Sequence, residues 1–128
     1  MLQYLWIGLG GFLGANARYL LQQWAAGRWG PDFPYGTMLA NISGSFVIAL
    51  FLTLATGRLV IPLETRLFIA IGFLGGFTTF SSLSYETFLL AQRSGWWAAG
   101  LNLIGNNLLG LAGVLLGVLL GQLIQRGG

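Results

Sequence analysis

Residues 72 to 86 read Gly-Phe-Leu-Gly-Gly-Phe-Thr-Thr-Phe-Ser-Ser-Leu-Ser-Tyr-Glu, within an otherwise apolar stretch of the chain. Six hydroxyl side chains, three glycines and a carboxylate stand where a membrane helix normally carries Leu and Val. Lipid offers no hydrogen-bond partner to backbone groups freed by such a segment, so they must be buried in protein or line a polar path. Polar groups at membrane depth are typical of transport sites. The segment therefore favours a protein that moves a small solute.

The composition of the 128-residue chain indicates an integral membrane protein. Hydrophobic residues make up 55% and charged residues 7%, and the mean hydropathy is +0.76. Soluble domains carry about 25% charged residues, so too few charges are present to cover a soluble surface. We predict a single transmembrane domain, residues 1–128, embedded in a lipid bilayer.

Charge and residue usage exclude several functions. The net charge of +3 comes from six arginines that are scattered singly rather than gathered in a patch, so we predict membrane-surface anchors and no nucleic-acid partner. The chain has neither cysteine nor histidine, which removes disulfides, thiol chemistry and the usual ligands of zinc, haem and iron–sulfur clusters. Its serines have no candidate base, so we expect no enzyme.

Four segments are long enough to span a bilayer, which takes roughly 20 mostly apolar residues. They are residues 2–24, 35–56, 64–91 and 96–124. The first segment has no basic region ahead of it and exceeds the apolar core of a signal peptide, so we expect a retained helix. The predicted fold is an all-α membrane protein with four transmembrane helices, the third broken at its Gly/Thr/Ser segment.

The arginines give little indication of orientation in the membrane. Four spans place both ends of the chain on one side, which would carry Arg58, Arg66 and Arg126; the other side would carry Arg28 and Arg93, with Arg18 just inside the first helix. Because the two sides carry nearly equal numbers of arginines, the positive-inside rule predicts almost no preferred orientation. A chain without an orientation signal can insert both ways, which predicts an antiparallel homodimer. A fixed topology with weak charge bias stays open.

Glycines four residues apart predict close helix packing. Gly10 and Gly14 form one such stripe, and Gly113, Gly117 and Gly121 form another. Small residues at this spacing let two helix backbones approach each other. The partner is either another helix of the same chain or a second copy. Four short helices cannot both pack one another and enclose a water path, so a pore implies an oligomer.

Polar side chains on the second and fourth spans predict a polar track. Thr37, Asn41 and Ser45 are four residues apart and therefore share one face of the second span. A single asparagine is explained by a hydrogen bond between helices. The fourth span, however, contains three asparagines: Asn102, Asn106 and Asn107. Three are more than packing usually demands, which favours a polar path.

Arg18 and Glu86 are the charges deepest in the predicted helices. The first and third helices end on the same side of the membrane, so the two residues lie at similar depth. Either charge alone is costly in lipid. We therefore predict a buried, structural ion pair that also shapes an entrance.

The glycine-hydroxyl segment itself has two interpretations. Gly72, Gly75 and Gly76 either permit a close helix crossing, or mark a discontinuous helix whose freed carbonyls hold a cation while half-helix N-termini face an anion. The hydroxyls that follow the glycines favour the second, because they can cap freed backbone groups. Phe80 fits the same interpretation, since the edge of an aromatic ring carries partial positive charge.

These residues resemble a known family. The segment 72–86 closely resembles the third-helix signature of the Fluc (CrcB-type) fluoride channels. Residues 36–41, Gly-Thr-Met-Leu-Ala-Asn, resemble the second-helix motif of that family, and residues 11–18, with Gly-Ala at 14–15 and Arg-Tyr at 18–19, resemble its first. Length, four spans and balanced charge fit along the whole chain.

The resemblance implies a dual-topology antiparallel homodimer with two fluoride pores and a central structural sodium ion. Gly75 and Thr78 would give backbone carbonyls to the sodium ion. Asn41 would be the pore-lining amide, and Phe80 an aromatic ring beside the fluoride path. The further polar groups near the path would be Thr37, Thr79, Ser81 and Asn107, with Arg18 near a pore vestibule. The sequence departs from the family pattern Thr-Thr-Phe-Ser-x-Phe-Ser at Leu83, which keeps the volume of phenylalanine but lacks the positive ring edge.

The implied function is passive, selective efflux of fluoride from the cytoplasm across the bacterial inner membrane, which gives fluoride resistance. No nucleotide motif suggests a pump driven by ATP. The alternative is a small dual-topology exporter of organic cations, of the small multidrug resistance type. Such an exporter needs a membrane-embedded carboxylate to exchange protons for its cargo, and in this chain only Glu86 fits that role.

Overall fold

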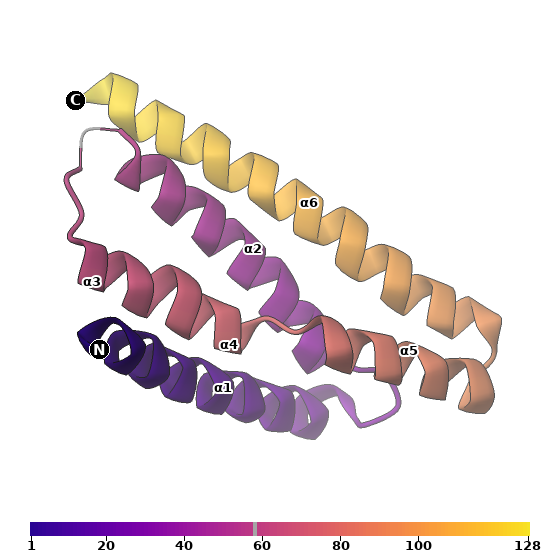
Figure 1. Ribbon diagram of the computed structural model, residues 1–128. Helices are drawn as coiled ribbons and strands as arrows, with labels where there is room; N and C mark the ends of the chain where they lie inside the picture. Colours follow the sequence, from indigo (N-terminus) through magenta and orange to yellow (C-terminus); the bar gives the residue numbers. More distant parts are fainter. Residues whose placement is uncertain (58) are drawn as a thin grey trace.

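The computed structural model describes residues 1–57 and 59–128 and is helical almost throughout (Figure 1). The elements are α1 (Leu2–Trp29), α2 (Tyr35–Ala55), α3 (Leu63–Arg66), η1 (Leu67–Leu74), α4 (Gly75–Phe77), α5 (Phe80–Arg93) and α6 (Trp96–Gly127). No strand occurs within these described ranges. Arg58, one of the charges in the orientation argument, lies outside them.

The four predicted spans correspond to these helices, with small differences at their ends. Because α3, η1 and α4 follow one another without interruption, they form with α5 a single third span that is broken once. The first helix extends to Trp29, five residues beyond the predicted end, and stops at Gly30, whose φ of 88° suits glycine. The fourth helix likewise continues past residue 124 to Gly127. The all-helical prediction with a broken third helix is therefore confirmed.

Within the described residues, three helical segments are both long and apolar enough to cross a membrane: Tyr35–Ala55, Leu63–Arg93 and Trp96–Gly127. The chain is thus a multi-pass membrane protein. Helix α1 is also long enough, since its 28 residues reach about 42 Å at 1.5 Å per residue. It falls outside this set because polar residues such as Asn16, Arg18 and Gln22 interrupt its apolar sequence.

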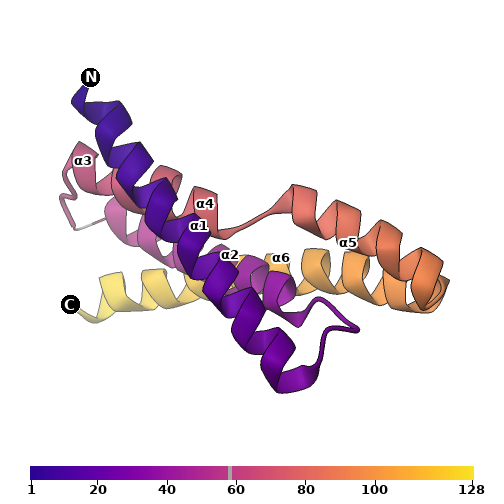
Figure 2. The ribbon, with the colours of Figure 1, turned by 90° about the horizontal axis from the view of Figure 1, so that it is seen from below.

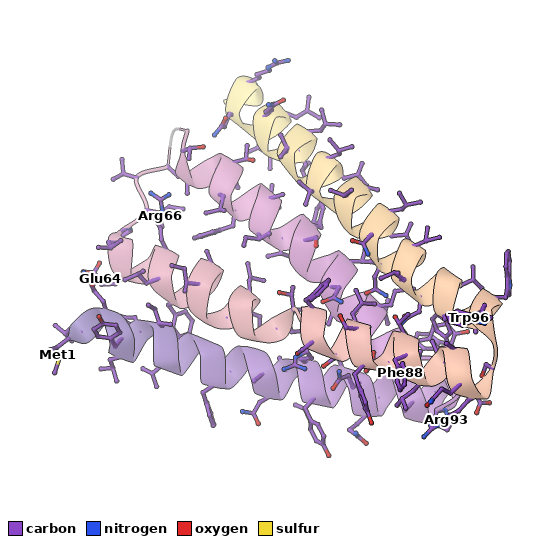
Figure 3. The ribbon with its side chains drawn as sticks, turned by 45° about the vertical axis from the view of Figure 1, so that its right-hand side comes forward. Met1, Glu64, Arg66, Phe88, Arg93 and Trp96 are labelled. Atoms are coloured by element: carbon purple, nitrogen blue, oxygen red, sulfur yellow. The ribbon has the colours of Figure 1, made fainter. Side chains whose placement is uncertain are left out.

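Both chain termini lie at one end of the helical bundle, as an even number of passes requires (Figure 1). Figure 3 shows Met1, Glu64 and Arg66 at that end, with Arg93 and Trp96 at the opposite end. Positive charge is therefore present at both ends of the bundle. This distribution agrees with the weak orientation signal of the sequence.

Helix α2 occupies the middle of the bundle and packs on both α6 and α1. The broken span lies across these helices, and its two halves have different neighbours. The α3–η1–α4 half packs on α1, whereas α5 lies beside α6 (Figures 1 and 2). The break is therefore the point at which the third span passes from one partner helix to another.

Both glycine stripes pack within the chain. A Cβ atom added at Gly117 would lie 2.5 Å from the carbonyl oxygen of Phe46 on α2, and one at Gly113 would lie 3.1 Å from that of Ile42. On α1, a Cβ at Gly14 would collide with the backbone of Phe73. Of the two interpretations left open by the sequence, packing within the chain is the one that the structure shows.

The segment Leu67–Leu74 is a π-helix, which the sequence did not predict. Such helices are rare and are frequently found at functional sites. Gly72 near its end touches α1 closely, because a Cβ there would lie 2.7 Å from the carbonyl oxygen of Ile7. One turn later, a Cβ at Gly76 would lie 2.8 Å from that of Gly11. The π-helix η1 and the short helix α4 therefore bring Gly72 and Gly76 into close contact with α1 just before the break.

Candidate functional site

The break in the third span consists of two residues, Thr78 and Thr79. Both have extended backbones, with ψ of 156° at Thr78 and φ of −154° at Thr79. The Thr78 hydroxyl donates to the carbonyl of Leu74 at 3.0 Å. The Thr79 hydroxyl accepts from the backbone N–H of Ser82 at 3.1 Å and so caps α5. The prediction that hydroxyls cap a discontinuous helix is confirmed.

Asn41 on α2 holds the break from one side. Its Oδ1 accepts from the backbone N–H of Thr79 at 2.8 Å, and its Nδ2 donates to the Thr79 carbonyl at 3.1 Å. The same Nδ2 donates to Oδ1 of Asn106 on α6 at 2.9 Å. One amide thus satisfies both backbone groups of an extended residue that has no helical partner.

Arg18 on α1 holds the break from the opposite side. Its Nε donates to the carbonyl oxygen of Gly76 at 3.2 Å, and Nη1 donates to the Ser82 hydroxyl at 3.4 Å. A positive charge therefore faces the C-terminal end of one half-helix, where the helix dipole favours it. The guanidinium also bridges to the first turn of α5. Arg18 connects the two half-helices across the gap.

The predicted ion pair between Arg18 and Glu86 is wrong. Glu86 instead accepts a hydrogen bond of 2.8 Å from the Thr37 hydroxyl, which in turn accepts one of 3.0 Å from Gln22. The arginine is directed to Gly76 and Ser82, because the exposed carbonyl at the helix end lies within its reach. The second oxygen of Glu86 is buried without a partner among the described residues.

A cavity of about 300 Å³ opens at the break. It is lined by Asn41, Gly44, Ser45, Ile48, Leu74, Gly75, Thr78, Thr79, Phe80, Leu83, Asn106 and Asn107. Most of the predicted site residues therefore come together here, although they derive from α2, the broken span and α6. Ser81 does not line this cavity, although its hydroxyl lies 3.4 Å from that of Thr79.

A second cavity, of about 410 Å³, lies toward the turn after α1. Thr37, Ser82, Glu86 and Arg93 are among its lining residues. Thr37 is therefore separated from the first cavity, which Asn41 and Ser45 line one and two turns further along α2. The predicted polar face of α2 runs past both cavities.

A family model described as "CrcB-like protein, Camphor Resistance (CrcB)" matches residues 5–118 of the chain. The chain belongs to the CrcB-like family. Among its relatives, a protein from Roseiflexus sp. (strain RS-1) named "Fluoride-specific ion channel FluC" is 54% identical over 111 residues, 87% of this chain and 90% of the relative. Proteins of the same name from Koribacter versatilis (strain Ellin345) and Paramagnetospirillum magneticum are 49% and 43% identical, covering 88% and 98% of this chain and 90% and 100% of those proteins.

Two backbone carbonyls at the break of this CrcB-like chain are suited to hold a cation. In a continuous helix the Gly75 carbonyl would accept from the Thr79 N–H, but that N–H donates to Asn41 instead. Within the described chain, neither Gly75 nor Thr78 has a hydrogen-bond partner for its carbonyl oxygen. Oxygen ligands of this kind are what a hard cation such as sodium takes.

Several predicted site residues face outward from the single chain. Phe80 is 76% exposed, and Gly75 and Asn107 are also exposed, the Asn107 amide being bonded only to the Leu103 carbonyl of its own helix. Leu83, at the position where the family pattern has its second phenylalanine, is only 4% exposed and lines the cavity beside Phe80.

Sequence reasoning did not identify every residue of this site. Asn102 and Asn106 were predicted to share a helix face, and their spacing was a usable signal. Ser82 belongs to the hydroxyl run that the sequence singled out, but its bond to Arg18 was not predicted. Gln22 and Thr87 gave no signal, because each is an isolated polar residue whose partner lies on another helix.

Proposed function

We propose that the chain is a fluoride-selective channel of the bacterial inner membrane through which fluoride leaves the cytoplasm passively. Membership of the CrcB-like family and the fluoride-channel names of relatives at 54% and 49% identity support this function. The observation that carries it is the cavity at the break, which joins an amide, threonine hydroxyls and an aromatic ring at the middle of a membrane-spanning segment. Such a set of groups suits the passage of an ion rather than catalysis.

The working unit in this proposal is an antiparallel homodimer with two pores. Phe80 and Gly75 are exposed in the single chain although they border the cavity. A second copy would cover them and complete the cavity wall. The glycine stripes are already occupied within the chain, so the dimer contact would involve the face that carries the break. The balanced charge at the two ends suits copies of opposite orientation.

We place a structural sodium ion at the centre of this dimer. Each copy would supply the carbonyl oxygens of Gly75 and Thr78. Their lack of hydrogen-bond partners supports this role. The ion would neutralise the partial negative charge of two half-helix ends that face each other.

Fluoride conduction follows from the donors around the cavity. Fluoride is small and strongly hydrated, so a selective path has to replace water with hydrogen-bond donors at short range. In this proposal the hydroxyls of Thr79 and Ser81 and the ring edge of Phe80 do so without a full positive charge. Asn41 joins them by giving up one of its two amide hydrogen bonds, to the Thr79 carbonyl or to Asn106. Thr37 and Asn107 add polar groups further along the path, and Arg18 stands near the vestibule. Conduction needs binding that is strong enough for entry and weak enough for release.

The alternative of a cation exporter has weaker support. Its one carboxylate candidate, Glu86, is bonded to Thr37 on the polar face of α2, and the relatives carry the name of a different transporter. Expression in a bacterium that lacks its own fluoride exporter separates the two. We expect restored growth in millimolar fluoride and unchanged sensitivity to ethidium, relative to empty vector. Ethidium resistance without fluoride resistance would favour the exporter.

A further inference from the structure

Four polar side chains form a continuous chain of hydrogen bonds that leads away from the break. Asn41 donates to Oδ1 of Asn106 at 2.9 Å. Asn106 donates through Nδ2 to Oδ1 of Asn102 at 3.1 Å and to its main-chain oxygen at 2.8 Å. Asn102 donates to the Thr87 hydroxyl at 3.0 Å. This series of hydrogen bonds thus connects α2 to α6 and α6 to α5.

This relay, made of Asn41, Asn106, Asn102 and Thr87, begins and ends on backbone groups of the same half-span. At one end Asn41 accepts from the N–H of Thr79. At the other end Thr87 donates to the carbonyl of Leu83 at 2.7 Å. A backbone N–H can only donate and a carbonyl can only accept. The direction of every hydrogen bond between them is therefore fixed.

Two members of the relay, Asn102 and Thr87, line neither the cavity at the break nor the one beside Glu86. Asn102 is 0% exposed, whereas Thr87 is partly exposed and lines a separate cavity between α5 and the start of α6. Of the four relay members, only Asn41 and Asn106 line the cavity at the break, so only they can contact an ion there. A buried amide without partners is costly, so the fully buried Asn102 depends on its bonds to Asn106 and Thr87.

We propose that Thr87, acting through Asn102 and Asn106, is a positioning residue that fixes the orientation of the Asn41 amide at the break. Without the acceptor oxygen of Thr87, Nδ2 of Asn102 has no partner, so the Asn102 side chain is no longer held with its Oδ1 toward Asn106. Asn106 would then lose one of its two acceptors and hold Asn41 less firmly. The consequence for transport rests on the proposed fluoride channel, whereas the orientation of the amide does not.

The test compares Thr87→Val, which removes the hydroxyl at nearly constant volume, with Thr87→Ser, which retains it. Thr56→Val is the matched control, since the Thr56 hydroxyl also donates to the carbonyl four residues before it and, among the described residues, has no hydrogen bond to another helix. The first readout is the side-chain amide NMR signal of Asn41 in detergent-solubilised protein labelled with nitrogen-15. We expect this signal to shift in Thr87→Val and to stay in place in Thr87→Ser and Thr56→Val.

The second readout is fluoride efflux from liposomes. We expect Thr87→Val to lower the rate by about tenfold, the scale of one hydrogen bond lost from a buried amide, and the two other variants to keep the parental rate. Unchanged Asn41 signals in Thr87→Val would overturn the proposal, as would unchanged efflux in a conducting protein. If the parent does not conduct, the channel proposal fails, and the NMR comparison alone decides the positioning role of Thr87. Thr87→Ala replaces Thr87→Val if the latter does not fold.

Discussion

Asn41 on α2 bonds both backbone polar groups of Thr79, with its Oδ1 2.8 Å from the Thr79 nitrogen and its Nδ2 3.1 Å from the Thr79 oxygen. A side-chain amide thus substitutes for the helical hydrogen bonds that the break removes. In lipid, backbone groups without partners would be costly. The break is therefore a defined structure held by tertiary contacts, rather than a loosened helix.

Replacing Asn41 by leucine is expected to destabilise the fold and abolish transport. Two backbone groups of Thr79 would lose their partners, at a cost of about 1–3 kcal/mol each. Thermal unfolding in detergent and liposome efflux measure the two effects. Asn16→Leu is the matched control, because Asn16 is exposed and bonds only within its own helix. Equal stability of the two variants would contradict the clamp at Thr79.

Exchanging the charges of Arg18 and Glu86 is not expected to rescue either single variant. Arg18 donates hydrogen bonds to the Gly76 carbonyl and the Ser82 hydroxyl, and an ionised glutamate cannot donate to either. We expect Arg18→Glu, Glu86→Arg and the double variant all to be less stable than the parent, the double variant at least as much as Arg18→Glu. Thermal unfolding measures this. Restored stability in the double variant would instead indicate a direct ion pair.

The two glycines Gly117 and Gly100 on α6 are expected to respond oppositely to alanine. A Cβ at Gly117 meets the Phe46 carbonyl at 2.5 Å, whereas one at Gly100 meets nothing within 4 Å. Gly117→Ala should lower stability by about 1–3 kcal/mol through overpacking, and Gly100→Ala should be neutral or slightly stabilising. Chemical unfolding distinguishes them. If Gly117→Ala only weakened dimerisation while the subunit fold stayed intact, the stripe would be a dimer seam.

Leu83 is expected to accept phenylalanine but not alanine. Its side chain is buried beside the cavity of about 300 Å³ at the break, which leaves room for a ring. Leu83→Ala should cost about 2–5 kcal/mol of stability, as large-to-small core changes do. We expect Leu83→Phe to fold and to conduct fluoride at least as fast as the parent, because it adds a second ring edge. Slower efflux with Phe would show that the ring obstructs the path.

Sodium is expected to stabilise the folded protein. If the carbonyls of Gly75 and Thr78 bind it, exchange of sodium for N-methylglucamine should lower the unfolding temperature, since a ligand that binds only the folded state stabilises it. Potassium at equal ionic strength is the control for general salt effects. Identical unfolding temperatures in all three buffers would argue against the cation site.

The sequence was sufficient to predict the elements that depend on local patterns. The four spans, the broken third helix and the close-packing glycines all followed from hydropathy and from residue spacing. The π-helix at Leu67–Leu74 did not, because its residues are ordinary apolar ones that give no local signal for it. The extended backbone at Thr78 and Thr79 was located to within the segment but not to the residue.

Side-chain partners across helices were the part that the sequence could not supply. Arg18 and Glu86 were paired by depth and charge, yet the arginine bonds a backbone carbonyl that only the break exposes. The relay through Asn102 and Thr87 was likewise missed, because helix rotation decides which polar residues meet. The sequence singled out Asn41 as a pore-lining amide, which stays a prediction, and its bonds to Thr79 were not foreseen.

The most direct test of the fluoride-channel account is ion efflux from liposomes that contain the purified protein, followed with a fluoride electrode against a parallel chloride measurement. Protein-free liposomes and the Asn41→Leu variant serve as controls. The account predicts rapid fluoride release by the parent, chloride retained, and little release by the variant. Retention of fluoride by the parent, or equal release of both anions, would contradict it.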